Sequence, residues 1–335
     1  MISRLYDTIH LLACLSPRRA FNLFKLFSSY YFSQYTGKVK HWGNPFTISI
    51  EPTTSCNLRC PECPSGLRKF TRNTGSLSLE MYRQVIDQLH PDLFYLILYF
   101  QGEPYLNPLF FQMVGEVRKK KIYTATSTNA HFLTDSLARK TVESGLDRII
   151  ISLDGLDQET YEKYRSGGSI KKVIEGTRNL VKWKRELRSK TPYIILQFII
   201  FSTNEHQIPE LRKLAKDLGV DKLELKSAQV YNYEEGNPLI PVNESLSRYK
   251  KKMEGMYVID NPMYNHCLRM WRGCVITWDG LVVPCCFDKD ANHRLGDLKK
   301  QSFKEIWRGE TYYAFRKKLF SSRREIDICK NCTER

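Results

Sequence analysis

The chain has 335 residues, of which 42% are hydrophobic, and its formal net charge is +16 at pH 7. That length provides an ample core for one large domain plus a smaller one. No segment reaches the roughly 20 apolar residues of a membrane span, and the N-terminus lacks the cleavage site of a signal peptide. The ten cysteines cluster in metal-ligand spacings, which excludes a secreted disulfide scaffold and indicates a reducing cytosol.

The positive charge comes in short basic runs, most of them on or beside expected helices. Solvated helix faces explain such runs best, and an anionic membrane surface is the next explanation. Nucleic acid is the least favoured partner, because the sequence has no aromatic-interleaved basic stretch and no recognised nucleic-acid motif.

Residues 1–45 form an amphipathic segment that is basic and rich in aromatic residues. Apolar residues recur at helical spacing from Ile2 to Leu15, and a second group runs from Phe21 to Phe32. Residues 1–40 hold six Lys and Arg and one acid. The pattern predicts two helices, which either lie on an anionic bilayer surface or pack their aromatic side chains against the rest of the protein.

From residue 46 onward, strand-like and helix-like segments alternate. Strands are expected at 46–54, 94–101, 122–128, 148–154, 193–202 and 222–229. Helices are expected at about 79–90, 108–120, 134–145, 158–188 (with Gly167-Gly168 as the point of a break), 206–218 and 242–253. Six β/α units in series predict an α/β fold with a parallel sheet over 46–230. Residues 231–262 then form a linker, and 263–335 form a separate cysteine-rich unit.

The most informative motif is C-x3-C-x2-C, formed by Cys56, Cys60 and Cys63 directly after the first expected strand. Three thiolates on one loop can hold three irons of a 4Fe–4S cluster and leave the fourth iron open. Zinc with an unspecified fourth ligand is the alternative. The loop resembles that of the radical S-adenosylmethionine (SAM) enzymes, in which SAM chelates the open iron and is cleaved to a 5′-deoxyadenosyl radical.

Further elements of that resemblance follow the next strands. Gly102-Glu103-Pro104 resembles the family's Gly-Gly-Glu-Pro motif, which receives the SAM ammonium group. The resemblance implies a cofactor-binding set drawn from the ends of four β/α units: Gly102, Glu103, Asn129, Ser152, Asp154 and Arg165. In this resemblance Arg165 binds the carboxylate of SAM. An arginine suits that role because its planar guanidinium can pair a carboxylate through two hydrogen bonds.

Two departures from the family pattern concern the same site. Gln101 replaces the first glycine of the Gly-Gly-Glu-Pro motif, which narrows the backbone freedom there. Glu62 stands where the family usually has an aromatic residue just before the third cysteine, so the group that contacts adenine is not identified.

The C-terminal unit resembles the SPASM/twitch extensions of radical SAM enzymes. It has a cysteine, a hairpin with an Asp-Gly turn that ends in Pro-Cys, a helix near Trp307 and a final C-x2-C. The resemblance implies one auxiliary 4Fe–4S cluster held by Cys267, Cys285, Cys329 and Cys332. Cys274 and Cys286 are possible substitute ligands, and a zinc ribbon is the alternative for this unit.

The resemblance implies a partial (β/α)6 TIM-like barrel with a small C-terminal iron–sulfur domain. It implies an enzyme that uses SAM and two 4Fe–4S clusters, takes electrons from a flavodoxin- or ferredoxin-type donor and performs a net oxidation. A cytoplasmic location is expected, and a peripheral position on the inner face of the membrane is the alternative that residues 1–45 leave open. A non-catalytic iron–sulfur or zinc regulator is the remote alternative.

The substrate is the least determined part of this prediction. A small or lipid-linked alcohol or carbohydrate is favoured, because only 45 residues precede the first expected strand and they do not read as a leader-binding domain. Modification of a peptide or protein, by crosslinking or side-chain oxidation, is the alternative. Alcohol oxidation needs a base, and the weak candidates at the end of the sixth strand are Lys226, Gln229 and Tyr231.

Overall fold

The structure, a computed structural model, describes residues 2–252 and 255–333 and divides into two compact units. The first unit consists of Met1–Asp7, Cys56–Lys69 and Ala125–Asp260. The second unit consists of Thr8–Ser55, Phe70–Thr124 and Asn261–Arg335. Each unit therefore combines segments that are distant in the sequence, and the first cysteine loop belongs to the first unit.

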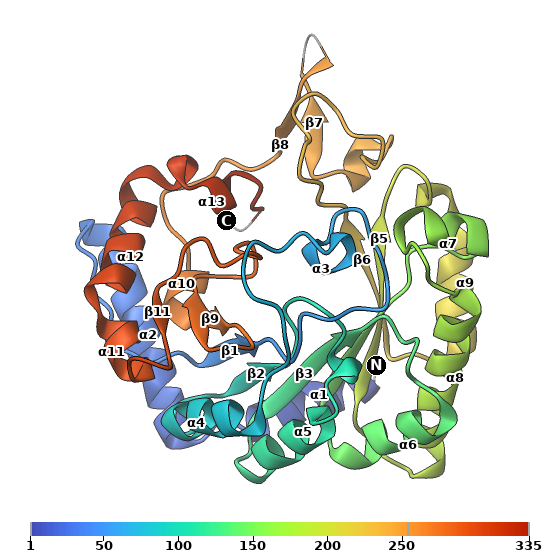
Figure 1. Cartoon of the computed structure of the whole chain (residues 1–335), viewed down its shortest axis with the longest axis horizontal. Helices are drawn as coiled ribbons and strands as arrows, with labels where there is room; N and C mark the ends of the chain where they lie inside the picture. Colours follow the sequence, from blue (N-terminus) through green and yellow to red (C-terminus); the bar gives the residue numbers. More distant parts are fainter. Residues whose placement is uncertain (1, 253–254, 334–335) are drawn as a thin grey trace. The chain divides into compact units, whose positions relative to one another are not determined.

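The first unit contains a run of parallel strands with helices between them. The strands follow the order β3 (Tyr123–Thr128, of which Ala125 onward belongs here), β4 (Arg148–Ser152), β5 (Tyr193–Ile200) and β6 (Lys222–Ser227). The helices are α6 (Asp135–Ser144), α7 (Gln158–Tyr164), α8 (Ile170–Glu186) and α9 (Ile208–Leu218), and Figure 1 shows them along the outer side of these strands. Shorter elements are α3 (Pro64–Leu67), η2 (Glu205–Gln207), η3 (Glu244–Leu246), β7 (Tyr249–Lys251) and β8 (Tyr257–Ile259).

Local sequence accounts for where these helices begin and end. Asp157 caps α7 by accepting a hydrogen bond from the Thr160 amide at 2.8 Å. The expected long helix over 158–188 is broken into α7 and α8, because Gly167 adopts φ +77° and Ser169 caps a new helix. Gly219 ends α9 in the left-handed conformation.

The second unit holds the remaining elements. Its helices are α1 (Ile2–Ala13, of which Thr8 onward belongs here), α2 (Pro17–Thr36), α4 (Leu79–Leu89), η1 (Pro104–Leu106), α5 (Phe110–Lys119), α10 (Arg269–Arg272), α11 (Phe303–Arg308), α12 (Glu310–Ser322), η5 (Arg323–Glu325) and α13 (Asp327–Lys330). Its strands are β1 (Thr47–Ile50), β2 (Tyr95–Ile97), β9 (Gly273–Ile276), β10 (Leu281–Val283) and β11 (Gly296–Asp297), in the order β11-β10-β9-β1-β2.

The C-terminal hairpin extends the sheet through β1. β9 runs parallel to β1, with Thr47 opposite Gly273, and β10 runs antiparallel to β9. A Cβ at Gly273 would lie 2.0 Å from the Thr47 carbonyl oxygen, so this close approach requires glycine. Because the side of β1 away from β2 is taken by β9, the six β/α strands do not close into a full barrel. The predicted fold class, α/β with a partial barrel, is confirmed.

One predicted helix is wrong. Residues 242–253 were expected to be helical, but the described part of this segment forms the turn η3 and the strand β7. The reason is Tyr249, which is buried, stacks on Tyr233 with ring centroids 4.6 Å apart, and accepts a hydrogen bond from the Val230 amide at 3.0 Å. These tertiary contacts override a weak helical propensity.

A buried ion pair in the second unit links β1 to the C-terminal hairpin. Glu51 directly follows β1, and its carboxylate accepts two hydrogen bonds from Arg72, at 2.6 and 2.8 Å. The Trp278 amide, in the turn between β9 and β10, donates to the same carboxylate at 3.2 Å. Both charged side chains are almost fully buried, so each depends on the other for its partner.

We expect Arg72→Met to lower the free energy of unfolding by about 3–5 kcal/mol, because the Glu51 carboxylate would be left buried without its cation. Anaerobic urea unfolding measures this change. The matched control is Arg83→Met, which breaks the exposed Arg83–Glu116 pair and should cost less than about 1 kcal/mol. Equal losses from the two variants would show that burial does not set the strength of the Glu51 pair.

Candidate active site

The first cysteine motif lies on a tight loop that leads into α3. Cys60 is buried, and Cys56 and Cys63 are half-buried. The loop turns back on itself, because the Cys63 amide donates to the Cys60 carbonyl at 3.3 Å. Gly66 completes the turn, since a Cβ there would lie 2.5 Å from the Cys60 amide nitrogen. Cys60 belongs to a buried apolar cluster, and Cys56 and Cys63 pack against that cluster.

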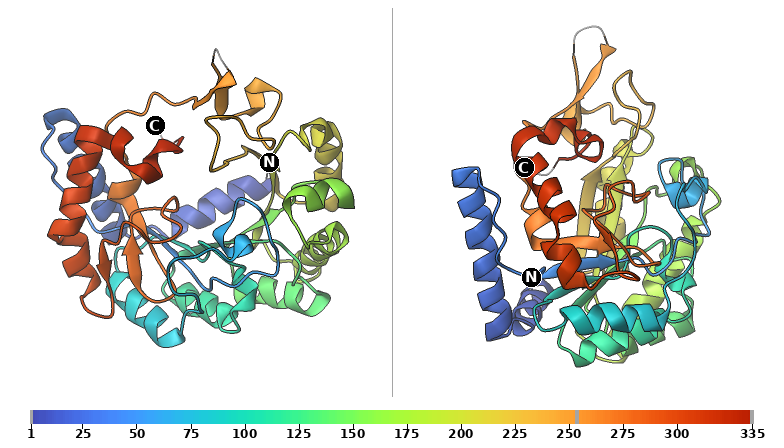
Figure 2. Two further views of the ribbon diagram at one scale, coloured as in Figure 1. Left: turned by 45° about the horizontal axis from the view of Figure 1, so that its top comes forward. Right: turned by 60° about the vertical axis from the view of Figure 1, so that its left-hand side comes forward.

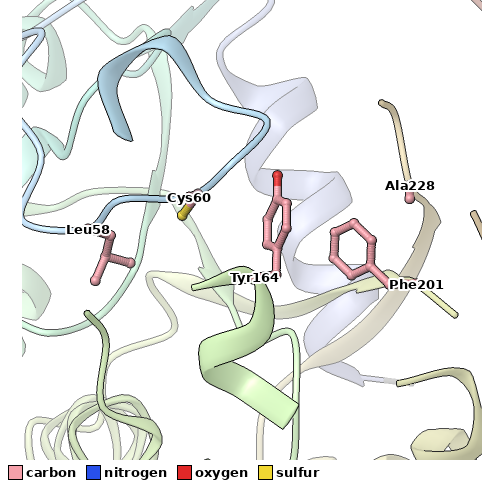
Figure 3. Packing of buried hydrophobic residues seen from close by; sticks show 5 residues of the cluster. All are labelled: Leu58, Cys60, Tyr164, Phe201 and Ala228. Carbon is pink, nitrogen blue, oxygen red and sulfur yellow. The ribbon is translucent and has the colours of Figure 1, made fainter. Parts of the chain in front are cut away.

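The loop rests on the end of α7. Tyr164 packs between Cys60 and Phe201, with Leu58 and Ala228 completing the cluster (Figure 3). The Tyr164 and Phe201 rings have centroids 4.2 Å apart. The sequence motifs do not predict that apolar side chains pack against the cysteine loop. The one sequence signal for this packing is Tyr164, the aromatic residue next to Arg165.

An ion pair beneath the loop orients Arg165. Its Nε donates to Asp154 Oδ2 at 2.5 Å, and Asp154 Oδ1 accepts from the Ile199 amide at 2.7 Å. The Arg165 Nη1 lies 4.0 Å from the Cys60 sulfur. Burial raises the pKa of the Cys60 thiol, and the Arg165 guanidinium acts in the opposite direction. Asp154 is fully buried, so its carboxylate fixes Arg165 and does not face solvent.

The other predicted SAM contacts of the first unit lie at strand ends around the same loop. Asn129 follows β3; its side-chain amide donates to Asn57 Oδ1 at 2.8 Å and lies 4.0 Å from the Cys56 sulfur. Ser152 ends β4 and is buried opposite Gln197 of β5. The Gln197 side-chain oxygen is buried and accepts no hydrogen bond within the described protein. A bound group with a donor at this position would satisfy it.

Gly102 and Glu103 lie in the second unit, just before η1. Gly102 adopts φ +73°, and a Cβ there would lie 2.2 Å from the Thr53 carbonyl oxygen. The Glu103 amide donates at 2.7 Å to the carbonyl of Ser55, the residue before Cys56 in the sequence. Glu103 is buried, and its carboxylate accepts from the Tyr105 amide at 3.3 Å. Gln101, which departs from the family pattern, precedes this turn and is buried.

The structure gives the unusual Glu62 a contact. Its carboxylate accepts a hydrogen bond from the Tyr231 amide at 2.8 Å, which ties the cysteine loop to the segment after β6. Tyr231 and Lys226 are exposed, and Gln229 is half-buried. The role of Lys226, Gln229 or Tyr231 as a base stays a prediction from the sequence.

The C-terminal cysteines converge in the second unit. A small cavity there is lined by six apolar residues, by Arg269 and Arg323, and by Cys267, Cys285, Cys329 and Cys332. Burial, together with the neighbouring Cys267, raises the pKa of the Cys329 thiol to about 12. Thiols in such a site ionise when a metal supplies positive charge. The four residues predicted for an auxiliary cluster are therefore brought together, which fits that group.

Cys274 and Cys286 occupy a different place. Both line a second cavity of about 170 Å³ together with Cys285. Arg269 Nη1 lies 2.9 Å from the Cys286 sulfur. Cys285 thus lies between the two cavities, whereas Cys274 and Cys286 do not line the smaller one.

The described residues do not form a complete set of metal ligands by themselves. Among residues 2–252 and 255–333, no group of three or more His, Cys, Asp and Glu side chains converges closely enough to hold a metal ion by itself. The chemistry of the donors, the basic group beside Cys60 and the unsatisfied oxygen of Gln197 nonetheless match the cluster and the SAM expected here.

Comparison with protein families identifies the two domains that contain these cysteines. Residues 50–215 match the family model described as the radical SAM superfamily. The chain belongs to the radical SAM superfamily. Residues 267–333 match the SPASM model, described as an iron-sulfur cluster-binding domain. These matches confirm a radical SAM enzyme with SAM, a 4Fe–4S cluster and an auxiliary iron–sulfur site as its cofactors.

Relatives of this radical SAM enzyme extend over most of its length. The chain is 29% identical over 304 residues to a tungsten-containing aldehyde ferredoxin oxidoreductase cofactor-modifying protein of Pyrococcus furiosus, covering 80% of this chain and 82% of that one. It is 22% identical over 285 residues to the PqqA peptide cyclase of Granulibacter bethesdensis, covering 79% and 74%. The structure of Streptococcus suis SuiB bound to precursor peptide SuiA has the same fold, with a TM-score of 0.63, 15% identity and coverage of 88% and 72%.

Replacing Cys56, Cys60 and Cys63 together by Ala should lower the iron content from about eight to about four per chain, because one of two four-iron clusters loses its thiolates. Formation of 5′-deoxyadenosine should disappear. Iron analysis and a SAM-cleavage assay after anaerobic reconstitution measure both effects. Cys14→Ala is the control, since Cys14 is buried among Phe94 and Tyr123 and belongs to neither motif. SAM cleavage that survived in the triple variant would refute the assignment.

Replacing Cys329 and Cys332 by Ala should remove the auxiliary cluster and lower the thermal stability of the C-terminal segment, since metal binding and folding are coupled. Cleavage of SAM without substrate should persist, because the first cysteine loop is unchanged. Metal analysis with differential scanning calorimetry tests this. One zinc per chain beside about four iron in the unaltered protein would instead favour the zinc-ribbon alternative.

Proposed function

We propose that this enzyme modifies a peptide or protein by removing a hydrogen atom from one of its side chains. This replaces the small alcohol that the sequence favoured. The prediction of a small alcohol depended on the length of the segment before the first strand. The length of that segment does not indicate which substrate the proposed pocket accepts. The peptide alternative from the sequence is better supported by the relatives and by the size of the cavity.

The relatives support a peptide substrate. One is named a PqqA peptide cyclase and matches over 79% of this chain. The fold is also that of SuiB, whose structure contains a precursor peptide. The Pyrococcus protein, named for cofactor modification, leaves a non-peptide substrate as the competing class.

The cavity of about 170 Å³, which we call the arginine pocket, carries the proposal. Its residues are Thr47, Ser49, Ile97, Tyr99, Phe100, Arg269, Arg272, Gly273, Cys274, Val275, Pro284, Cys285 and Cys286. Tyr99 and Phe100 come two and three residues after the C-terminal end of β2, and ligands bind at this end of the strands in parallel β/α folds. The pocket also includes Cys285, which lines the auxiliary cysteine cavity as well.

The size and lining of this pocket suit a single side chain. Binding sites for small molecules usually have volumes of roughly 300–1,000 Å³. The arginine pocket is smaller than that. The two arginines can each pair with a carboxylate or a carbonyl oxygen, and Tyr99 and Phe100 supply apolar walls. An extended peptide could place one residue in the pocket while its backbone stays outside.

The proposal gives each site residue a role. Cys56, Cys60 and Cys63 hold the cluster that binds SAM, and Gly102 and Glu103 receive the SAM ammonium group. Asn129, Ser152 and Arg165 contact SAM, whereas Asp154 positions Arg165 through their buried ion pair. Cys267, Cys285, Cys329 and Cys332 hold the auxiliary cluster. Once loaded, the site supplies a 5′-deoxyadenosyl radical for hydrogen abstraction and an acceptor for the remaining electron.

Tripeptides of the form Gly-X-Gly and a panel of sugar and polyol alcohols, each with SAM and a chemical reductant, separate the two substrate classes. A peptide substrate should raise 5′-deoxyadenosine above its uncoupled level and lose hydrogen in mass spectrometry. Stimulation by alcohols alone would contradict the proposal.

A substitution in the arginine pocket tests whether this pocket binds the substrate. We expect Arg272→Gln to lower coupled turnover about tenfold, which corresponds to one charge-assisted hydrogen bond. Uncoupled SAM cleavage should not change, since Arg272 is not among the SAM contacts. Arg294→Gln is the control, because Arg294 is exposed and lines a separate cavity. Equal effects of the two substitutions would exclude the pocket as the substrate site.

A further inference from the structure

We propose that the exposed face of α2 docks on the surface of an anionic lipid bilayer. The helix belongs wholly to the second unit and runs along its edge beside α10 (Figure 2). Among the described residues, no helix is long and apolar enough to cross a membrane. The contact we propose therefore lies in the plane of the bilayer surface.

The face of α2 that is turned toward the protein is mainly polar. Asn22 exchanges two hydrogen bonds of 2.8 Å with the backbone of Asn44. The Ser33 hydroxyl donates to the Lys40 carbonyl at 3.0 Å, and the Tyr30 hydroxyl lies 2.9 Å from a His266 ring nitrogen. These polar contacts determine which side of the helix faces inward. They reverse the usual arrangement, in which the apolar side of a surface helix is buried.

The outward face of α2 is aromatic. We call it the α2 aromatic stripe, and its members with their exposed fractions are Phe21 (60%), Phe24 (66%), Tyr31 (60%) and Tyr35 (93%). The spacings of three, seven and four residues place them along one side of a helix. Phe32 and Trp42, at one border of the stripe, are also exposed and lie with ring centroids 5.7 Å apart. Several exposed aromatic side chains on one helix face are typical of an interaction site.

Helix α1 shows the same reversal. Ile9 and Leu12 are each 56% exposed, and Leu5 on the same side of the helix is 62% exposed. In contrast, Asp7 is buried and forms an ion pair with Arg148 at 2.5 Å. The sequence alternative, in which the segment packs its aromatic side chains on the protein, holds for the buried Tyr30 but not for these exposed residues.

The charge around the stripe complements an anionic surface. Asp7 is the only acid among the first 45 residues, and it is buried. Lys25 lies over the Phe21 ring, 5.1 Å from its centroid, and Lys38 and Lys40 are exposed just after the helix ends. Aromatic and basic side chains on one exposed helix face are typical of helices at a membrane interface. Each basic residue near such a surface adds attraction to anionic lipid.

A second copy of this chain is a poorer occupant of the stripe. Two chains would each bring a formal charge of +16, and the residues bordering the stripe are basic on both copies. Like charges would then meet across the contact, whereas an anionic bilayer would neutralise them.

Vesicle co-sedimentation of the full-length reconstituted enzyme tests the proposal. Vesicles of phosphatidylcholine with phosphatidylglycerol should bind the enzyme at least tenfold more tightly than vesicles of phosphatidylcholine alone. High salt should weaken this binding because it screens the charges. Phe24→Ser with Tyr35→Ser should weaken binding to anionic vesicles at least tenfold and leave uncoupled SAM cleavage unchanged.

Two further variants keep the test decisive. Tyr313→Ser removes an exposed aromatic residue from α12 and should bind like the unaltered enzyme. Lys25→Gln with Lys38→Gln should weaken binding and reduce its dependence on salt, without removing any aromatic residue. Equal binding of the double serine variant, or no binding to anionic vesicles at low salt, would overturn the proposal. So would dimerisation in light scattering that the double serine variant abolishes, because a second copy would then occupy the stripe.

Discussion

The buried ion pair between Asp154 and Arg165 organises the candidate site of the first unit. Asp154 follows β4, Arg165 follows α7, and the Ile199 amide of β5 binds the remaining carboxylate oxygen. A charge buried this deeply requires its partner, so the pair constrains the end of α7 to one position. That position supports the cysteine loop, because Tyr164 packs on Cys60.

The residues predicted to hold the cluster and SAM could be found in the sequence, because they follow the ends of successive strands in an alternating β/α pattern. The cysteine spacing and the polar residues after successive strands are local signals, and the structure places Asn129 and Arg165 near the cysteine loop as expected. The ends of most elements were also predictable, since Asp157 and Gly219 are ordinary helix caps.

What could not be predicted depends on contacts between distant segments. Glu51 and Arg72 are separated by 21 residues, and no local pattern reveals that they pair. The strand at 249–251 replaces an expected helix because Tyr249 is held by Val230 and Tyr233. The reversed orientation of α2 is of the same kind: its amphipathic pattern was visible, but the hydrogen bonds of Asn22 and Ser33 decide which side faces the protein.

The central claim is that the cluster held by Cys56, Cys60 and Cys63 keeps one iron open for SAM. Electron paramagnetic resonance of the Cys329→Ala, Cys332→Ala enzyme tests this most directly, because the auxiliary cluster no longer contributes. After reduction, the spectrum should change on addition of SAM, and SAM labelled with ¹⁷O in its carboxylate should show hyperfine coupling to the cluster. A reduced cluster whose spectrum is the same with and without SAM, and which shows no coupling to the label, would contradict the account.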